Sequence, residues 1–192
     1  DTSIRTGWFY HPEEDTDVRT ADELLDIYLD AVGANASLLL NIPPDAHGRI
    51  AAPDCASLAE LGTKIQQIFA GNVTEKAKIT ADSAIAQHPI IQAVDGMADT
   101  YWQAAYGQES DTITLNFPKP QKVSCVVLGE HLPTGQRIES GEIWADGSRV
   151  AEFTVVGHKR ICRFAPVDVQ TLTIKITASR TEPTLRLLEV YQ

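Results

Sequence analysis

Residues 111–117, DTITLNF, and residues 170–178, QTLTIKITA, alternate apolar with polar side chains. This period of two is typical of a β-strand with one face buried and the other in water. Further β-type runs lie between turn residues in the second half of the chain: KVSCVVLGE (122–130), SGEIWADG (140–147), VAEFTVV (150–156), RICRFA (160–165) and LRLLEVYQ (185–192). Such closely spaced short runs predict an all-β sandwich.

The first half alternates strand and helix patterns. Thr20 and Glu23 form a capping box before LLDIYLDAV (24–32), whose apolar residues recur at helical spacing, and Gly33 stands where a C-terminal cap is expected. The run SLLLNI (37–42) suits a strand buried on both faces. Pro53 begins a second helix with an apolar stripe at Leu58, Leu61, Ile65, Ile68 and Phe69.

This order of elements is the βα rhythm of a barrel or of a doubly wound sheet, and two such units cannot close a barrel by themselves. We therefore expect an α/β segment, the last βα units of a (β/α)8-like barrel, over residues 1–70. Residues 71–77, GNVTEKA, are expected to be a linker, and residues 78–192 the β-sandwich.

Charge and composition limit the classes of ligand. The net charge of −10 argues against a nucleic-acid partner and against docking on an anionic membrane, whereas a neutral sugar is indifferent to it. No apolar run is long enough to span a bilayer. The cysteines at 55, 125 and 162 have no metal-binding spacing, so we expect buried thiols, with a Cys125–Cys162 disulfide as the alternative.

Two places in the first half are candidate site positions, because function in a barrel sits where strands end. Arg5, Trp8 and His11 follow the β-prone TSI of residues 2–4, and Asn41 lies at the end of SLLLNI. An arginine can bind several hydroxyls and an indole can cover the apolar face of a sugar. The alternative is that Trp8, Phe9 and Tyr10 are core residues and that Arg5 belongs to a structural ion pair.

A family resemblance favours the sugar-binding interpretation. DTSIRTGWFYHPEED (1–15) and ELLDIYLDAVGANASLLLNIPPDAHGRI (23–50) resemble the end of the catalytic domain of glycoside hydrolase family 29, the α-L-fucosidases. The likeness is greatest to the subfamily that acts on α1,3- and α1,4-linked fucose, where a proline commonly stands at the position of Thr6. The resemblance implies a retaining hydrolase that acts on fucosylated glycans and needs no cofactor for catalysis. It also implies a secreted or periplasmic location.

Retaining glycosidases of this kind use two carboxylates. The resemblance places the nucleophile well upstream of residue 1, and the glutamate that serves as acid and then base roughly two residues before Asp1. We therefore expect the catalytic pair to lie outside this chain, in the upstream remainder of the barrel. Glu13, Glu14 and Asp15 follow the matched block and are interpreted as a solvated charge cluster.

The second half resembles the C-terminal module of the same enzymes, a discoidin-like jelly roll also known from family 32 carbohydrate-binding modules. Asp95-Gly96 followed by Thr100-Tyr101-Trp102 is similar to a calcium loop of such folds, and Glu189 stands where a late glutamate ligand is expected. Met97 replaces a second acidic residue, so only its backbone carbonyl could contribute. The resemblance thus implies a structural Ca²⁺ at Asp95, Thr100 and Glu189; the alternative is that Asp95 and Thr100 only fix a turn.

Two other functions stay open: a freestanding carbohydrate-binding, lectin-like protein and a non-catalytic structural module. The first would leave the SLLLNI strand with unpaired edges, which argues against it.

Overall fold

The structure, a computed structural model, describes all residues from 1 to 192. It contains two compact units: residues 1–32 with 36–69 form an α/β unit, and residues 33–35 with 70–192 form a β unit. No helix in either unit is long and apolar enough to cross a membrane.

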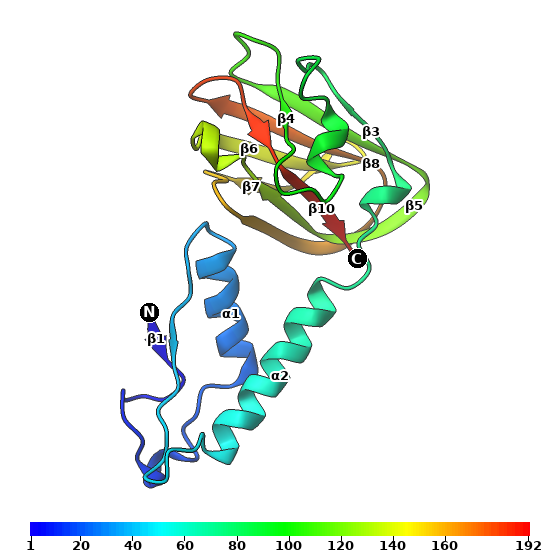
Figure 1. Cartoon of the computed structure of the whole chain (residues 1–192). Helices are drawn as coiled ribbons and strands as arrows, with labels where there is room; N and C mark the ends of the chain where they lie inside the picture. Colours follow the sequence, from blue (N-terminus) through cyan, green and yellow to red (C-terminus); the bar gives the residue numbers. More distant parts are fainter. The chain divides into compact units, whose positions relative to one another are not determined.

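The α/β unit contains two short parallel strands and two helices (Figure 1). Thr2 and Ser3 of β1 pair with Leu40 and Asn41 of β2. Its elements are β1 (Thr2–Ser3), the 3₁₀ turn η1 (Pro12–Glu14), α1 (Ala21–Val32), β2 (Leu40–Asn41) and α2 (Ala52–Ile68). The helices lie side by side, and their apolar stripes enclose a small core at Ile4, Ala21, Leu24, Leu25 and Leu61.

The start of α1 confirms the predicted capping box. The backbone N–H of Thr20 donates to Glu23 Oε2 at 2.8 Å, and the N–H of Glu23 donates back to Thr20 Oγ1 at 3.3 Å. The cap predicted at Gly33 is wrong, because the left-handed residue is Asn35, with φ of 68°. The N–H of Ala36 then reaches the carbonyl of Ala31 at 2.9 Å, so the turn closes beyond Gly33.

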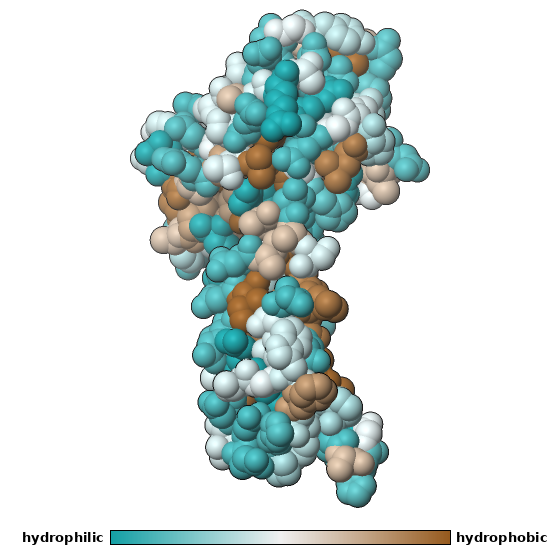
Figure 2. All heavy atoms as spheres, turned by 90° about the vertical axis from the view of Figure 1, so that its left-hand side faces the viewer, coloured by the Kyte–Doolittle hydropathy of each residue, from teal (hydrophilic) through white to brown (hydrophobic).

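The expectation of a long strand buried on both faces at SLLLNI is also wrong for this chain. Only Leu40 and Asn41 form a ladder, and Leu39 is 69% exposed. The cause is that β1 is the only strand paired with β2, so the remaining backbone has no partner to hold it extended. Figure 2 shows apolar patches, in brown, on the surface of this unit.

The β unit is built on one six-stranded sheet in which every pairing is antiparallel. The order along the sheet is β10-β5-β8-β6-β7, and β3 also pairs with β5; β4 and β9 form a separate pair. The strands are β3 (Lys78–Ala81), β4 (Trp102–Gln103), β5 (Asp111–Gly129), β6 (Ile138–Ala145), β7 (Ser148–Phe153), β8 (Arg160–Ser179), β9 (Thr184–Leu185) and β10 (Leu187–Tyr191), with 3₁₀ turns η2 (Thr74–Lys76), η3 (Ile90–Ala93) and η4 (Leu132–Thr134).

The period-two alternation is confirmed, because Ile113, Leu115 and Phe117 of β5 are buried. The number of strands differs from the prediction. DTITLNF and KVSCVVLGE belong to one strand, β5, and RICRFA and QTLTIKITA to one strand, β8. Pro118 and Pro120 fall where the β5–β8 register shifts between Asn116 and Gln121, so no ladder bond is lost there.

Residues 71–77 are not a linker. Val73 is buried and its N–H donates to the carbonyl of Val190 in β10 at 2.8 Å. Thr74 Oγ1 in turn accepts the N–H of Val190 at 2.8 Å. Because these backbone and side-chain groups are paired with the last strand, the segment is an integral part of the β unit.

The cysteines are all free thiols. Cys125 and Cys162 are buried, as expected, but Cys55 is exposed, so the expectation of three buried thiols is wrong at that position. Cys55 lies near the start of α2, on a side of the helix that no other element of this unit covers.

Candidate functional site

The candidate site residues of the first half lie at one edge of the α/β unit. Because β1 and β2 are parallel, their carboxyl ends meet at the same edge. Asn41 at the end of β2 joins the two segments, since its Nδ2 donates to Ser3 Oγ at 3.0 Å and to the carbonyl oxygen of Trp8 at 3.1 Å. The amide that was a candidate sugar ligand therefore also fixes the backbone of Trp8.

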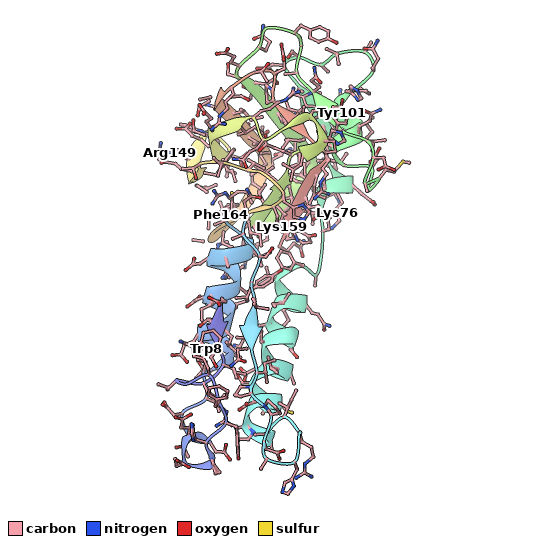
Figure 3. All side chains as sticks on the ribbon, turned by 60° about the vertical axis from the view of Figure 1, so that its left-hand side comes forward. Trp8, Lys76, Tyr101, Arg149, Lys159 and Phe164 are labelled. Atoms are coloured by element: carbon pink, nitrogen blue, oxygen red, sulfur yellow. The ribbon has the colours of Figure 1, made fainter.

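Trp8 lies on the loop that follows β1, where Figure 3 labels it. Its side chain is 53% exposed and that of its neighbour Phe9 is 77% exposed. His11 is exposed as well. The alternative in which Trp8 and Phe9 are core residues is therefore not what this chain shows, and an indole face and an imidazole are accessible at the carboxyl edge of the strands.

Arg5 is buried and engaged in an ion pair. Its Nε donates to Asp54 Oδ2 at 3.0 Å and its Nη2 to Asp54 Oδ1 at 2.8 Å, a two-point contact with a carboxylate that is itself fully buried. This hydrogen bond to Asp54 raises the pKa of Arg5 above its ordinary value, which keeps the guanidinium charged. The structural ion pair, left open as an alternative, is what the structure shows for Arg5.

Asp15 is not part of a solvated cluster. It accepts a hydrogen bond from Arg5 Nη2 at 2.8 Å and one from the Tyr10 hydroxyl at 3.4 Å. The Tyr10 ring centroid lies 4.7 Å from Cζ of Arg5, within range of a cation–π contact. Glu13 is exposed, as predicted, whereas one carboxylate oxygen of Glu14 is buried without a hydrogen-bond partner.

Sequence reasoning did not single out Asp54. An acidic residue after Pro53 in the first turn of a helix is ordinary, because it favours the positive end of the helix dipole. Its partner Arg5 is 49 residues away along the chain, so no local pattern connects the two. Only the packing of α2 against β1 could identify the pair.

The proposed calcium loop gathers several oxygens. Thr100 Oγ1 lies 2.9 and 2.8 Å from the two carboxylate oxygens of Asp95 and 3.3 Å from the carbonyl oxygen of Met97. The N–H of Met97 donates to Asp95 Oδ1 at 2.9 Å, which closes the turn. These four oxygens, from three residues, are the kind of ligand that a hard cation prefers, and the same contacts also satisfy the turn without an ion.

Glu189 lies in β10 opposite Val127, with its carboxylate hydrogen-bonded to Tyr191. Burial, followed by this hydrogen bond, raises the pKa of Tyr191. The loop residues thus fit a calcium ion in part, whereas the side-chain partner of Glu189 is Tyr191 rather than a residue of the loop. Calcium stays a prediction.

Loops of the β unit also carry an aromatic stack that the sequence did not reveal. Tyr101, labelled in Figure 3, lies between the rings of His88 and His131, with centroid distances of 3.8 and 3.9 Å. Both faces of Tyr101 are therefore occupied by protein. The indole of Trp144 in β6 is also engaged: Lys175 Nζ lies 4.0 Å from its ring centroid, and its N–H donates to Glu142 at 2.8 Å.

Comparisons with known proteins divide the chain at the same place as the structure. Residues 1–67 match the Alpha-L-fucosidase family, and residues 72–186 match a Domain of unknown function (DUF7402). The chain belongs to the DUF7402 family. Together, the two matched segments correspond to the C-terminal part of glycoside hydrolase family 29 α-L-fucosidases. This confirms the resemblance drawn from the sequence.

Individual relatives match over the whole chain. Alpha-L-fucosidase 1 of Arabidopsis thaliana is 31% identical over 100% of this chain and 40% of its own length. A solved structure from Bacteroides thetaiotaomicron, assigned to the α-L-fucosidases, superposes with a TM-score of 0.94 at 31% identity and covers 100% of this chain and 44% of its own. A Ruminococcus gnavus GH29 fucosidase in complex with fucose gives a TM-score of 0.91 at 27% identity, over 100% and 40%. This chain therefore spans less than half the length of these relatives.

Proposed function

We propose that this chain is part of a retaining α-L-fucosidase that removes terminal fucose, α1,3- or α1,4-linked, from glycans. The observation that carries the proposal is the exposed indole of Trp8 at the carboxyl edge of β1 and β2, fixed there by Asn41. In parallel α/β folds this edge is where substrates bind. Trp8, His11 and Asn41 are the residues that we assign to the fucose pocket, and an indole can cover the apolar face of a deoxy sugar.

The two catalytic carboxylates are proposed to come from outside this chain. Retaining hydrolysis needs a nucleophile and a protonated acid about 5–5.5 Å apart. Asp15 and Asp54 are both bound to the Arg5 guanidinium, so neither carboxylate is free to serve as the nucleophile or the acid. The exposed apolar side chains of Leu39 and Phe9 support further barrel elements around this segment, against which they would be buried.

The proposal is tested by assaying the release of an aryl alcohol from an aryl α-L-fucoside. A fucosidase that contains this chain together with the rest of its barrel should hydrolyse the substrate, whereas the 192-residue chain alone should not exceed background. In the active enzyme, Trp8→Ala should lower kcat/KM at least about tenfold, which corresponds to about 1.4 kcal/mol of transition-state stabilisation.

Trp144→Phe, in the β unit and already covered by Lys175, is the matched control and should leave kcat/KM unchanged. Fucose release by the purified 192-residue chain, abolished by Glu13→Gln or Glu14→Gln, would contradict the placement of the carboxylates. A folded Trp8→Ala enzyme with normal kinetics would remove Trp8 from the pocket.

A further inference from the structure

All three nitrogens of the Arg5 guanidinium are already hydrogen-bonded within the protein. Nε and Nη2 bind the two oxygens of Asp54, Nη2 also binds Asp15, and Nη1 donates to the carbonyl of His11 at 3.4 Å. The side chain is fully buried. Each of its contacts leads either to the first turn of α2 or to the loop that carries Trp8 and His11.

That loop, residues 6–17, is held at several points along its length. Thr6 Oγ1 donates to Asp17 Oδ2 at 2.8 Å and closes the loop across its ends. Asn41 holds the carbonyl of Trp8 from the other strand. Arg5 holds the far side of the loop through the His11 carbonyl and Asp15. Trp8 and His11 thus lie between an anchor on β2 and an anchor on Arg5.

We propose that Arg5, Asp54 and Asp15 are positioning residues that hold the loop of Trp8 and His11 in its substrate-binding conformation. The inference rests on the proposed function. Asp54 is the fixed point of the network, because it lies on a 17-residue helix, and a site supported by a helix is held more rigidly than one supported by a loop. The network transmits that rigidity across the planar guanidinium to Asp15.

The chemistry of the pair favours this role. A guanidinium that binds a carboxylate at two points fixes both the distance and the plane of its partner, which a lysine cannot do. A buried ion pair contributes little net stability compared with an apolar pair of the same shape, so its value lies in geometry. A position error of about 1 Å in a binding residue can reduce the rate up to about a hundredfold.

The test uses the fucosidase that contains this chain with the rest of its barrel. Asp15→Asn removes one charge from the network at a carboxylate that is 38% exposed, so the variant should fold, and Asp54→Asn removes the buried charge. Asp22→Asn is the matched control, because it breaks an ion pair of the same unit, with Lys64, on the exposed side of α1. All are compared by KM for an aryl fucoside and by Ki for free fucose, at a temperature where circular dichroism shows each variant folded.

Asp15→Asn should raise KM and Ki together by about threefold or more, and Asp54→Asn by about tenfold, while Asp22→Asn should stay within about twofold of the parent. A purely structural role would lower kcat through the folded fraction and leave KM and Ki unchanged. If Trp8→Ala raises Ki and the folded Asp15 and Asp54 variants do not, the positioning role is overturned while the pocket assignment stands. If Trp8→Ala also leaves Ki unchanged, the pocket assignment fails and the inference fails with it.

Discussion

Glu130 and Gly157 bind each other twice: the N–H of Gly157 donates to the Glu130 carboxylate at 2.6 Å, and the N–H of Glu130 donates to the Gly157 carbonyl at 2.8 Å. Glu130 is fully buried, and no cation neutralises it. Its other carboxylate oxygen accepts the N–H groups of Arg137 at 2.6 Å and Ile138 at 2.9 Å. One carboxylate therefore ties the turn before β6 and the turn before β8 to the end of β5.

The first prediction is that Glu130→Ala destabilises the β unit by about 3 kcal/mol or more. The substitution leaves three backbone N–H groups without an acceptor; those of Ile138 and Gly157 are buried and that of Arg137 is partly buried, and each buried one costs about 1–3 kcal/mol. Glu139→Ala, which breaks an exposed ion pair with Arg180, is the control and should cost less than about 1 kcal/mol. Urea unfolding of the chain measures the loss of stability in both variants. Equal midpoints for the two would show that the hydrogen bonds of Glu130 do not stabilise the β unit.

The second prediction concerns the thiols. Burial raises the pKa of Cys125 to about 11 and that of Cys162 to about 12, whereas Cys55 is exposed. Only a thiolate reacts quickly, so a disulfide reagent at pH 8 should label one thiol per chain rapidly. Cys55→Ser should abolish that fast phase, and all three thiols should react in urea. Only one reactive thiol in urea would instead indicate a Cys125–Cys162 disulfide.

The third prediction is a pH dependence at Glu182. The backbone N–H of Gly107, at 2.8 Å, and then the Thr181 hydroxyl, at 2.6 Å, lower the pKa of Glu182 from 4.5 to about 2. A carboxyl group whose pKa is lowered by folding stabilises the folded state above its unfolded pKa, and this contribution is lost as the pH falls through the folded pKa.

The Tm difference between the parent chain and Glu182→Gln should therefore be full at pH 6, shrink below about pH 4.5 and vanish near pH 2. Thr181→Ala removes the hydroxyl that donates to Glu182, so in that background the Tm difference caused by Glu182→Gln should be smaller. Thermal melts across this range provide the measurement, and a difference that is constant with pH would mean that Glu182 is not held in its ionised form.

Some of the fold was readable from the sequence because the deciding interactions are local. The alternation of Ile113 and Leu115 with polar neighbours predicted a half-buried strand, and Thr20 with Glu23 predicted the start of α1. Both depend on residues within a few positions of each other. The C-terminal cap of α1 was misplaced because the deciding contact is distant in sequence. Asn35 takes the left-handed conformation, and its side chain accepts the N–H of His158, 123 residues away.

In the candidate site, too, the sequence could identify the residues marked by a local pattern but not those joined by distant contacts. Trp8 and Asn41 could be nominated because each lies just after a β-type run, and the structure brings Asn41 to the carbonyl of Trp8. The buried partner of Arg5 could not be found, since Asp54 belongs to a helix whose packing no local pattern specifies. An arginine in a sugar-binding sequence context suggests a ligand contact, and only the complete set of its hydrogen bonds shows that each of its guanidinium nitrogens already binds a protein oxygen.

The last prediction concerns calcium at Asp95. The two carboxylate oxygens of Asp95 and the carbonyl oxygen of Met97 already lie within 3.3 Å of the hydroxyl oxygen of Thr100. Calcium takes six to eight oxygen ligands in flexible geometry, whereas Mg²⁺ demands a strict octahedron. We therefore expect chelator to lower the melting temperature of the β unit and added Ca²⁺ to restore it, with little effect from Mg²⁺.

At a free Ca²⁺ concentration 100 times Kd, the stabilisation should be about 2.7 kcal/mol by mass action. Asp95→Ala should remove the response, and Glu189→Gln should weaken it if that carboxylate leaves Tyr191 for the ion. Asp99→Ala, an exposed acid of the same loop, is the control and should keep the response.

A melting curve that chelator does not move in the parent chain would show that Asp95 serves the turn alone, through its hydrogen bonds from Met97 N–H and Thr100. In that case Asp95→Ala should still lower the melting temperature, equally with and without Ca²⁺.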